Sequence, residues 1–243
     1  MMLLQGKRAL ITGGTSGIGR AIAAAFVHAG ARVVIAGRDQ ARGEAVAREL
    51  GNATFIKADV SSLSDVRRLA AAATATLGQV DILVNNAGIY HFAPTHELSE
   101  ADFDAMVATN LKGPYFLTAV LAPGMAARGY GKIINITTMA AYVGLPGAAA
   151  YGATKAALDL LTKTWAAEYG PSGVNVNAIS PGPVRTEGTA GMGEGLYLLA
   201  SKAPAGRPAQ PSEIAAAALY LAGDDAAFVH GATLRVDGGR TAA

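Results

Sequence analysis

The sequence predicts an α/β fold in which one doubly wound, parallel sheet of about seven strands carries helices on both of its faces. Two observations predict this fold. Short apolar runs rich in β-branched residues alternate along the whole chain with longer runs rich in Ala and Leu. Most of the short runs are apolar throughout, as expected for strands that helices cover on both sides. The alternation predicts right-handed crossovers between parallel strands.

The length of 243 residues fits a single domain over residues 1–243. We expect strands at residues 8–12, 32–36, 54–57, 82–85, 133–137, 174–179 and 233–236. We expect helices at residues 17–29, 40–50, 63–76, 100–125, 149–169 and 211–221. The stretch after the sixth strand is rich in Gly and Pro and too long for an ordinary connection, so residues 183–210 are interpreted as a lid over the substrate.

Composition excludes several classes of protein. With 51% hydrophobic and 16% charged residues, the chain is not intrinsically disordered. The net charge of +2 and the scattered Lys and Arg residues lack the basic stripe of a nucleic-acid binder. The absence of cysteine excludes disulfides and thiolate chemistry. Apolar runs are too short to span a membrane, and the first residues do not have the form of a signal peptide. We therefore expect a cytoplasmic protein with a small-molecule substrate and no nucleic-acid, membrane or metal partner.

A glycine-rich turn with the pattern TGxxxGxG follows the first expected strand and precedes a helix. Its glycines would let backbone N–H groups approach a pyrophosphate, whose negative charge the helix N-terminus would favour. The spacing differs from the GxGxxG fingerprint of many dinucleotide-binding proteins. Because many strand-to-helix turns contain glycine, an ordinary structural turn remains the alternative for this motif alone.

Tyr151 and Lys155 lie four residues apart on an expected helix and therefore share one face. A nearby ammonium stabilises phenolate and lowers the pKa of a tyrosine from its usual value of about 10. Such a tyrosine can protonate a carbonyl oxygen as a hydride arrives, or deprotonate an alcohol in the reverse reaction. Taken alone, the YxxxK pattern is common by chance and is more typical of an ordinary surface pair.

Together, the motifs resemble the short-chain dehydrogenase/reductase family, in its compact single-domain branch, over nearly the whole chain. The matching positions are the turn at 12–19, Asp59 with Val60, the run at 85–88, Asn110, Tyr151 with Lys155, the run at 181–186 and the run at 236–239. The resemblance implies a Rossmann-type fold, a nicotinamide cofactor, and hydride transfer to or from a carbonyl or alcohol substrate.

The resemblance also implies a role for each position. Tyr151 would be the general acid or base, Lys155 would lower its pKa and hold the nicotinamide ribose, and Asn110 would hold a water that links Lys155 to solvent. Asn85 would brace the sheet. The further cofactor-binding positions would be Gly13, Thr15, Ser16, Gly17, Ile18 and Gly19 in the turn, Asp59 and Val60 beside the adenine, Asn86, Ala87 and Gly88 along the cofactor, and Pro181, Gly182, Val184 and Thr186 near the carboxamide.

One position departs from the family pattern. The family usually has a serine thirteen residues before the tyrosine, and this chain has Thr138 there. Its hydroxyl preserves the hydrogen bond to the substrate oxygen, while its methyl group stiffens χ1 and takes space. Thr137 competes for the role, but adjacent strand residues point to opposite faces, so only one is expected to reach the site. The spacing to Tyr151 selects Thr138. His230, where the family often has Thr, is interpreted as a structural or surface residue.

The end of the second expected strand bears on the choice of cofactor. An NAD site usually has an acidic residue there, which binds the ribose 2′-hydroxyl. Here Gly37 holds that position and is followed by Arg38, whose guanidinium suits a 2′-phosphate. Asp39 is the counter-argument, and we interpret it as the N-cap of the next helix. Thr15 is not basic, so no second cation is expected. The sequence favours NADP(H), with NAD(H) possible.

The residues expected to face the substrate are mainly apolar, and this favours a hydrophobic or cyclic ketone over a phosphosugar, although each could equally pack in the core. They are Tyr90, His91, Phe92, Ala140, Tyr142, Leu145, Met192, Leu196 and Tyr197. For His91 and Arg185, solvation is favoured over a contact with a polar substrate group.

Two rival functions remain: an NAD-dependent alcohol, polyol or hydroxysteroid dehydrogenase, and a non-catalytic dinucleotide sensor. The sensor is disfavoured because the chain keeps both Tyr151 and Lys155. The expected helix at 149–169 is apolar around much of its circumference, so the sequence predicts a homotetramer or homodimer.

Overall fold

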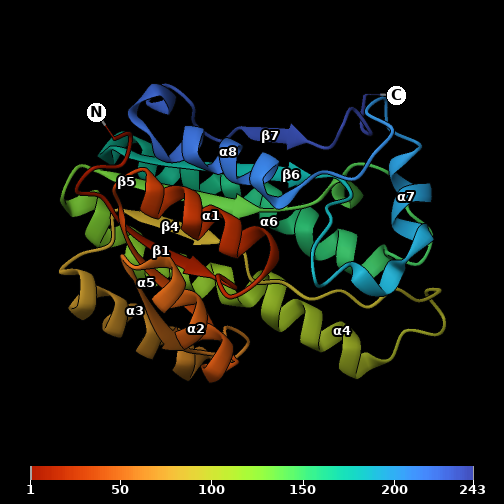
Figure 1. Ribbon diagram of the computed structural model, residues 1–243, viewed down its shortest axis with the longest axis horizontal. Helices are drawn as coiled ribbons and strands as arrows, with labels where there is room; N and C mark the ends of the chain where they lie inside the picture. The colour runs from red at the N-terminus through yellow and green to blue at the C-terminus, as the bar shows by residue number, and fades with distance from the viewer. Residues whose placement is uncertain (1, 243) are drawn as a thin grey trace.

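The computed structural model describes residues 2–242 and forms one sheet of seven parallel strands in the order β3-β2-β1-β4-β5-β6-β7 (Figure 1). The strands are β1 (Arg8–Thr12), β2 (Arg32–Gly37), β3 (Ala53–Lys57), β4 (Ile82–Asn85), β5 (Gly131–Ile136), β6 (Val174–Pro181) and β7 (Thr233–Val236). The helices are α1 (Gly17–His28), α2 (Gln40–Leu50), α3 (Leu63–Leu77), α4 (Glu100–Val107), α5 (Gly113–Ala127), α6 (Ala149–Tyr169), α7 (Glu194–Ala200) and α8 (Pro211–Ala222).

Two apolar cores hold helices against the two faces of the sheet. Residues of α1, α2 and α8 pack with one set of strand side chains, and residues of α3, α5 and α6 pack with the other set. Both faces of the central strands are covered, which is why β1 and β4 are buried along almost their whole length. The doubly wound parallel sheet with helices on both faces is confirmed, and each expected strand lies within two residues of its expected bounds.

The strand order reverses beside β1, because β2 and β3 follow on one side of it and β4 to β7 follow on the other. In open parallel sheets the loops at the carboxyl ends of the strands separate at such a point and leave a crevice for a ligand. The β1–α1 turn and the loop after β4 therefore face each other across this crevice.

The prediction of a single helix over residues 100–125 was wrong, because a π-helical turn at Ala108–Lys112 separates α4 from α5. Pro114 stands in the first turn of α5 and has no backbone N–H to donate to the carbonyl four residues earlier. Gly113 touches the loop after β3, where an added Cβ would lie 2.5 Å from the carbonyl oxygen of Val60. The wider turn carries Asn110, so the interruption lies at a candidate site residue.

The sequence predicts no regular element in segment 183–210, but the structure has two there. It contains a 3₁₀ turn at Ala190–Met192 and the two-turn helix α7, which buries Leu196 and Ala200. Seven residues are too few to display a clear helical periodicity in the sequence.

Polar side chains tie the strands together at their amino ends. The Asp81 carboxylate accepts hydrogen bonds from the backbone N–H of Arg8 at 3.1 Å and from Gln79 Nε2 at 2.6 Å. Lys132 Nζ donates to Asn175 Oδ1 at 2.9 Å, and the Asn175 amide lies 2.9 Å from His230 Nε2. The structural interpretation of His230 is thus confirmed. Within residues 2–242, no helix is both long and apolar enough to cross a membrane.

Candidate active site

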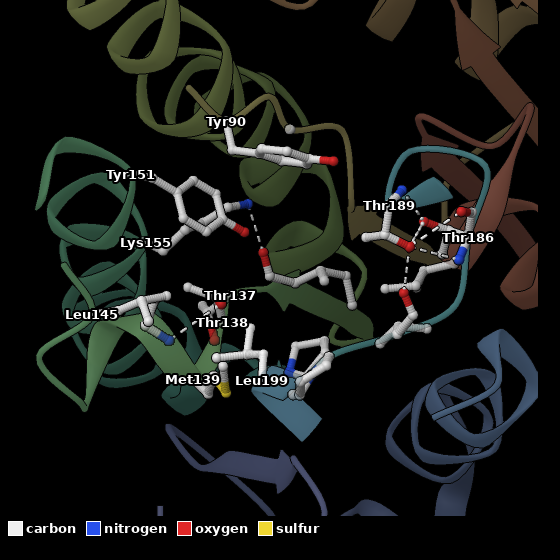
Figure 2. Close-up of a pocket in the computed structure, with 18 of the residues that line it drawn as sticks. Tyr90, Thr137, Thr138, Met139, Leu145, Tyr151, Lys155, Thr186, Thr189 and Leu199 are labelled. Carbon is white, nitrogen blue, oxygen red and sulfur yellow. Dashed lines mark hydrogen bonds between the residues drawn. The ribbon is translucent and has the colours of Figure 1, made fainter. Parts of the chain in front are cut away.

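Two adjoining cavities open at the carboxyl ends of the strands. We call the first cavity the groove, and its volume is about 360 Å³. We call the second cavity the pocket, and its volume is about 210 Å³ (Figure 2). They share the lining residues Ile18, Asn86, Gly88, Tyr90 and Thr186. A long ligand lying in the groove can therefore present one end to the pocket.

The groove brings together most of the residues expected to bind a cofactor. Expected residues that line it are Gly13, Thr15, Ser16, Gly17, Ile18, Arg38, Asp59, Val60, Asn86, Ala87, Gly88 and Thr186. Those that line the pocket instead are Tyr151, Lys155, Pro181, Gly182 and Val184. Gly19 lines neither cavity. An added Cβ there would lie 2.2 Å from the carbonyl oxygen of Gly13, so Gly19 lets α1 pack tightly against the turn.

The β1–α1 turn keeps its shape through glycine and through bonds to the end of β4. Gly13 has a positive φ of 64°, and an added Cβ there would meet Asn86 Nδ2 at 2.9 Å. Asn86 Nδ2 donates to the carbonyl oxygen of Thr12 at 2.9 Å, while the hydroxyl of Thr12 accepts from the backbone N–H of Asn86 at 3.0 Å. The two walls of the groove are thus fixed relative to each other.

The N-terminus of α1 fits the phosphate groups of a dinucleotide. Its N-cap residue, Ser16, makes no side-chain capping bond. Within residues 2–242, the backbone N–H groups of Ile18 and Gly19 have no hydrogen-bond partner. Free N–H groups at the positive end of a helix dipole form a site for an anion. The groove therefore fits the expected nicotinamide dinucleotide.

Tyr151 and Lys155 reach into the pocket from α6 (Figure 2). Burial raises the pKa of the Tyr151 phenol, and a side-chain hydrogen bond with Thr138 lowers it by less. Burial lowers the pKa of Lys155 to about 8, and Lys155 Nζ donates to the carbonyl oxygen of Ile136 at 2.9 Å. The prediction that the Lys155 ammonium lowers the pKa of Tyr151 was therefore wrong for the cofactor-free chain. The pKa is raised, because desolvation outweighs the other contributions.

Thr138 is beside Tyr151, as the spacing predicted. It is the N-cap of the 3₁₀ turn Met139–Ala141, and its side chain accepts from the backbone N–H of Ala140 at 3.3 Å. Gly152 makes this closeness possible, because an added Cβ there would lie 2.6 Å from the carbonyl oxygen of Ala140. Thr137 also lines the pocket. The Thr137 hydroxyl, however, donates to the carbonyl oxygen of Ile179 at 3.1 Å.

Asn110 braces the loop that follows β4. Its Oδ1 accepts from the backbone N–H of Ile89 at 2.9 Å, and its Nδ2 donates to the Ile89 carbonyl at 2.8 Å and to Thr154 Oγ1 at 3.2 Å. An added Cβ on Gly88 would lie 3.2 Å from Lys155 Nζ and 3.3 Å from Asn110 Oδ1. Any side chain at position 88 would fill the space in front of the lysine. Asn85 braces the sheet as expected, because its Nδ2 donates to Asn135 Oδ1 at 2.9 Å.

Six of the nine residues expected to face the substrate line the pocket, and three do not. The six are Tyr90, Phe92, Ala140, Leu145, Met192 and Leu196. His91 instead lies 3.4 Å from Asp102. The Tyr197 hydroxyl bonds to the Arg185 guanidinium at 2.6 Å, and Arg235 covers the ring of Tyr142 at 4.6 Å.

Sequence reasoning missed other lining residues and the way the aromatic rings meet. Met139 and Leu199 line the pocket, and Leu199 lies on α7, which the sequence did not indicate. Tyr90 stacks on Phe92 with centroids 5.0 Å apart, and both rings lie edge-on to Tyr151 at 6.0 Å. Two aromatic rings thus flank the phenol that is the candidate acid.

The far end of the groove is lined by charged residues of the β2–α2 connection. Asp39 is the N-cap of α2, as expected, and its Oδ1 accepts from the backbone N–H of Arg42 at 3.0 Å. Gly37 and Arg38 line the groove, and so does Arg42. A second basic side chain therefore lines the groove beside Arg38. Arg42 lies three residues after the N-cap residue Asp39. This spacing is the signal in the sequence that could have indicated Arg42.

Comparison with known proteins agrees with this geometry. Residues 13–241 match the family described as enoyl-(acyl carrier protein) reductase. The chain is 42% identical to D-threitol dehydrogenase of Mycolicibacterium smegmatis, over 98% of this chain and 94% of that protein. It is 41% identical to L-fucose dehydrogenase of Bos taurus, over 96% and 89%. A solved structure of a short chain dehydrogenase/reductase family protein is 51% identical and superposes with a TM-score of 0.94, covering 100% of both chains. The chain belongs to the short-chain dehydrogenase/reductase family and is an NAD(P)-dependent oxidoreductase that acts on alcohol or carbonyl groups.

Proposed function

We propose that this oxidoreductase uses NADP(H) and reduces a hydrophobic or cyclic ketone. The observation that carries the proposal is the lining of the pocket around Tyr151. Lys155 is the only charged residue among the described residues that line it, and most of the others are apolar. A polyol bound there would leave several hydroxyl groups without partners, and each buried polar group left unpaired costs free energy.

The bound cofactor supplies the hydride. Tyr151 donates its phenolic proton to the substrate oxygen, and its raised pKa keeps the phenol protonated at neutral pH. Thr138 donates a second hydrogen bond to the same oxygen as negative charge builds there. With a pKa of about 8, Lys155 is charged at neutral pH and holds the nicotinamide ribose, while Asn110 positions the water that returns a proton to the site. These roles favour the reductive direction.

The preference for NADP(H) is supported by the β2–α2 connection. Arg38 lines the groove where a 2′-phosphate would lie, and Gly37 gives no carboxylate for a ribose hydroxyl. The Asp39 carboxylate already accepts the capping bond from the backbone of α2. Arg38→Leu is therefore expected to reduce the preference for NADPH over NADH.

Two further features belong to the proposal. Segment 183–210 acts as a lid, since Val184, Thr189, Met192 and Leu196 line the pocket from it. The protein assembles as a homotetramer or homodimer, supported by large apolar side chains that are exposed on its surface.

The second candidate is an NAD-dependent alcohol or polyol dehydrogenase, and the names of relatives favour it. They include D-threitol dehydrogenase, L-fucose dehydrogenase and the gluconate 5-dehydrogenase of Gluconobacter oxydans, which is 38% identical. The apolar pocket is the observation against it.

Steady-state turnover with a panel of substrates tests the proposal. Cyclic, aryl and straight-chain ketones and keto sugars are offered with NADPH and NADH, and polyols are offered with NADP⁺ and NAD⁺. We expect the highest kcat/KM for a cyclic or aryl ketone with NADPH. Tyr151→Phe should still bind NADPH but lose turnover by about 10²-fold or more, because it has no proton to donate. Equal use of NADH, or a higher kcat/KM for a polyol, would contradict the proposal.

A further inference from the structure

We propose that Arg42 is a second cation for the cofactor's 2′-phosphate, which would lie between the guanidinium groups of Arg38 and Arg42. This inference rests on the proposed use of NADP(H) and names a specificity residue that the sequence did not reveal. Both arginines line the groove next to Asp59 and Val60, at the end opposite the pocket (Arg42 from the first turn of α2).

The packing of α2 fixes where Arg42 lies. Gly43, the next residue, faces β3 so closely that an added Cβ would lie 2.1 Å from the ring of Phe55. No side chain therefore separates this turn of α2 from the sheet, and the helix begins close to the carboxyl ends of β2 and β3. Arg42 is held at the rim of the groove, while its side chain is 58% exposed and free to reach a ligand.

The Asp39 carboxylate contacts the backbone of Arg42 and lies near its guanidinium. Asp39 Oδ1 accepts the capping bond from the backbone N–H of Arg42, and Oδ2 lies 3.8 Å from Arg42 Nε. Within residues 2–242, the two terminal nitrogens of Arg42 donate to no partner. A guanidinium whose Nε edge faces a carboxylate still offers its terminal N–H groups, which match the oxygens of a phosphate.

The charges around this end of the groove favour a second cation beside Arg38. The ionised groups that line this end are Arg38, Asp39, Arg42 and Asp59. Without Arg42 the remaining three would carry a net charge of −1 and would repel a phosphate. With Arg42 the four groups sum to zero, and the two cations can contact the phosphate while Asp39 is held by the helix cap.

Cofactor titrations without substrate test the inference. Dissociation constants for NADPH and NADH are measured by nicotinamide fluorescence for wild type, Arg42→Ala and Arg48→Ala. Arg48 is the matched control, because it lies on the same helix but lines a different surface hollow, so its removal changes the net charge equally. We expect Arg42→Ala to weaken NADPH binding about tenfold and NADH binding less than about twofold. Arg48→Ala should change both by less than about twofold.

Three outcomes would overturn the inference. Arg42→Ala could bind NADPH like Arg48→Ala, which would mean that no local contact exists. It could weaken NADPH and NADH equally, which would mean that Arg42 shapes the groove and does not read the phosphate. NADPH preference could be lost in Arg38→Leu but kept in Arg42→Ala, in which case Arg42 is excluded and the proposed function stands. The proposed cofactor itself fails if wild type binds NADH as tightly as NADPH.

Discussion

Thr138 and Thr137 are neighbours with separate tasks at the end of β5. Thr138 lies beside Tyr151 and lowers the pKa of its phenol, whereas the Thr137 hydroxyl donates to the carbonyl oxygen of Ile179 in β6. Thr138→Val keeps the shape and removes the hydroxyl. We expect kcat to fall by about 10²-fold with a smaller change in KM, because the bond strengthens as charge builds on the substrate oxygen. Steady-state kinetics of ketone reduction measure both constants.

Thr137→Val is the control for Thr138→Val. It leaves the Ile179 carbonyl without its side-chain donor, so we expect a stability loss of about 1 kcal/mol and little loss of kcat. Thr138→Ser should retain activity and accept bulkier ketones, because only a methyl group is removed. If Thr137→Val lost kcat and Thr138→Val did not, the roles of the two residues would be reversed.

Lys155 destabilises the cofactor-free protein because it is only 3% exposed. Its pKa is about 8 in the folded chain and about 10.5 in the unfolded chain. Below pH 8 both states hold the proton and the cost of burying the charge is fully present. Between pH 8 and 10.5 the folded state releases the proton first, so stability rises with pH. The shift corresponds to roughly 3 kcal/mol before other losses are counted.

We therefore expect Lys155→Met to be more stable than wild type at pH 7 by about 2 kcal/mol, since the lost bond to Ile136 offsets part of the gain. The difference should shrink as the pH approaches 10. Urea denaturation of both proteins without cofactor, at several pH values, measures it. A variant that is less stable than wild type at pH 7, or a difference independent of pH, would contradict this account.

The placement of residues was predictable where it depends on local spacing. Tyr151 and Lys155 share a helix face, and Asp39 caps the helix that follows it, so neighbouring letters of the sequence suffice. The direction of the Tyr151 pKa was not predictable, because desolvation depends on side chains from distant parts of the chain. Tyr142 was misplaced for the same reason, since the residue that covers its ring, Arg235, is remote in sequence.

At the scale of elements, the start of segment 183–210 bridges the two walls of the groove. Glu187 Oε2 accepts from the backbone N–H of Gly17 in the β1–α1 turn at 2.9 Å. The Tyr90 hydroxyl, from the loop after β4, donates to the carbonyl oxygen of Gly188 at 2.5 Å. Thr186 and Gly188 line the groove from this bridge. These bonds are made in the cofactor-free chain, so we expect the bridge to slow a cofactor that enters or leaves the groove.

Breaking one end of the bridge should speed both passage steps. We expect Glu187→Ala to raise the association and dissociation rates of NADPH by about fivefold each, with a smaller change in the dissociation constant. Stopped-flow fluorescence measures the rates. Glu187→Gln removes the same charge but keeps an acceptor oxygen, so it isolates the hydrogen bond. If Glu187→Gln matched Glu187→Ala, the negative charge and not the bond would be responsible.

Element types were predictable because strand and helix alternate with clear periods, and the bounds of the strands followed from their apolar runs. The π-helical turn at Ala108–Lys112 was not predictable. It depends on Pro114 together with the contact between Gly113 and Val60, and only the first of these is local. Helix α7 was missed because its two turns take their helical form from packing against the pocket.

At the scale of the whole molecule, two regions away from the pocket expose several large apolar side chains. One region lies on α4, α5 and α6, and its exposed members are Phe103, Tyr115, Val120 and Leu160. The other lies on α8, β7 and the loop between them, and its members are Tyr220, Phe228 and Leu234. Figure 1 places α4 far from β7 and α8, while α6 meets β7 where the Thr233 hydroxyl donates to Asp159. If each region pairs with the same region of another copy, the two pairings together generate a tetramer with two kinds of interface.

We therefore expect a homotetramer that falls apart in steps. Leu160 is 64% exposed and Phe228 is fully exposed, so Leu160→Glu and Phe228→Glu should each give dimers without unfolding the chain. The double variant should be monomeric. Light scattering at micromolar concentration measures the mass. Leu198→Glu is the control, since Leu198 is 67% exposed on α7, outside both regions. A monomeric wild type would refute the assembly.

The two ends of the sheet differ in a way that matters for directed evolution. The network of Asp81, Lys132, Asn175 and His230 holds the amino ends of the strands, whereas the pocket is lined from loops at the carboxyl ends. Changes at distant sites that share no partners act additively on stability. A library that randomises pocket positions such as Phe92, Leu145, Met192 and Leu199 can alter which ketones are accepted without weakening the amino-end network. Variants that lose stability can then be rescued by substitutions at that end, chosen without regard to substrate.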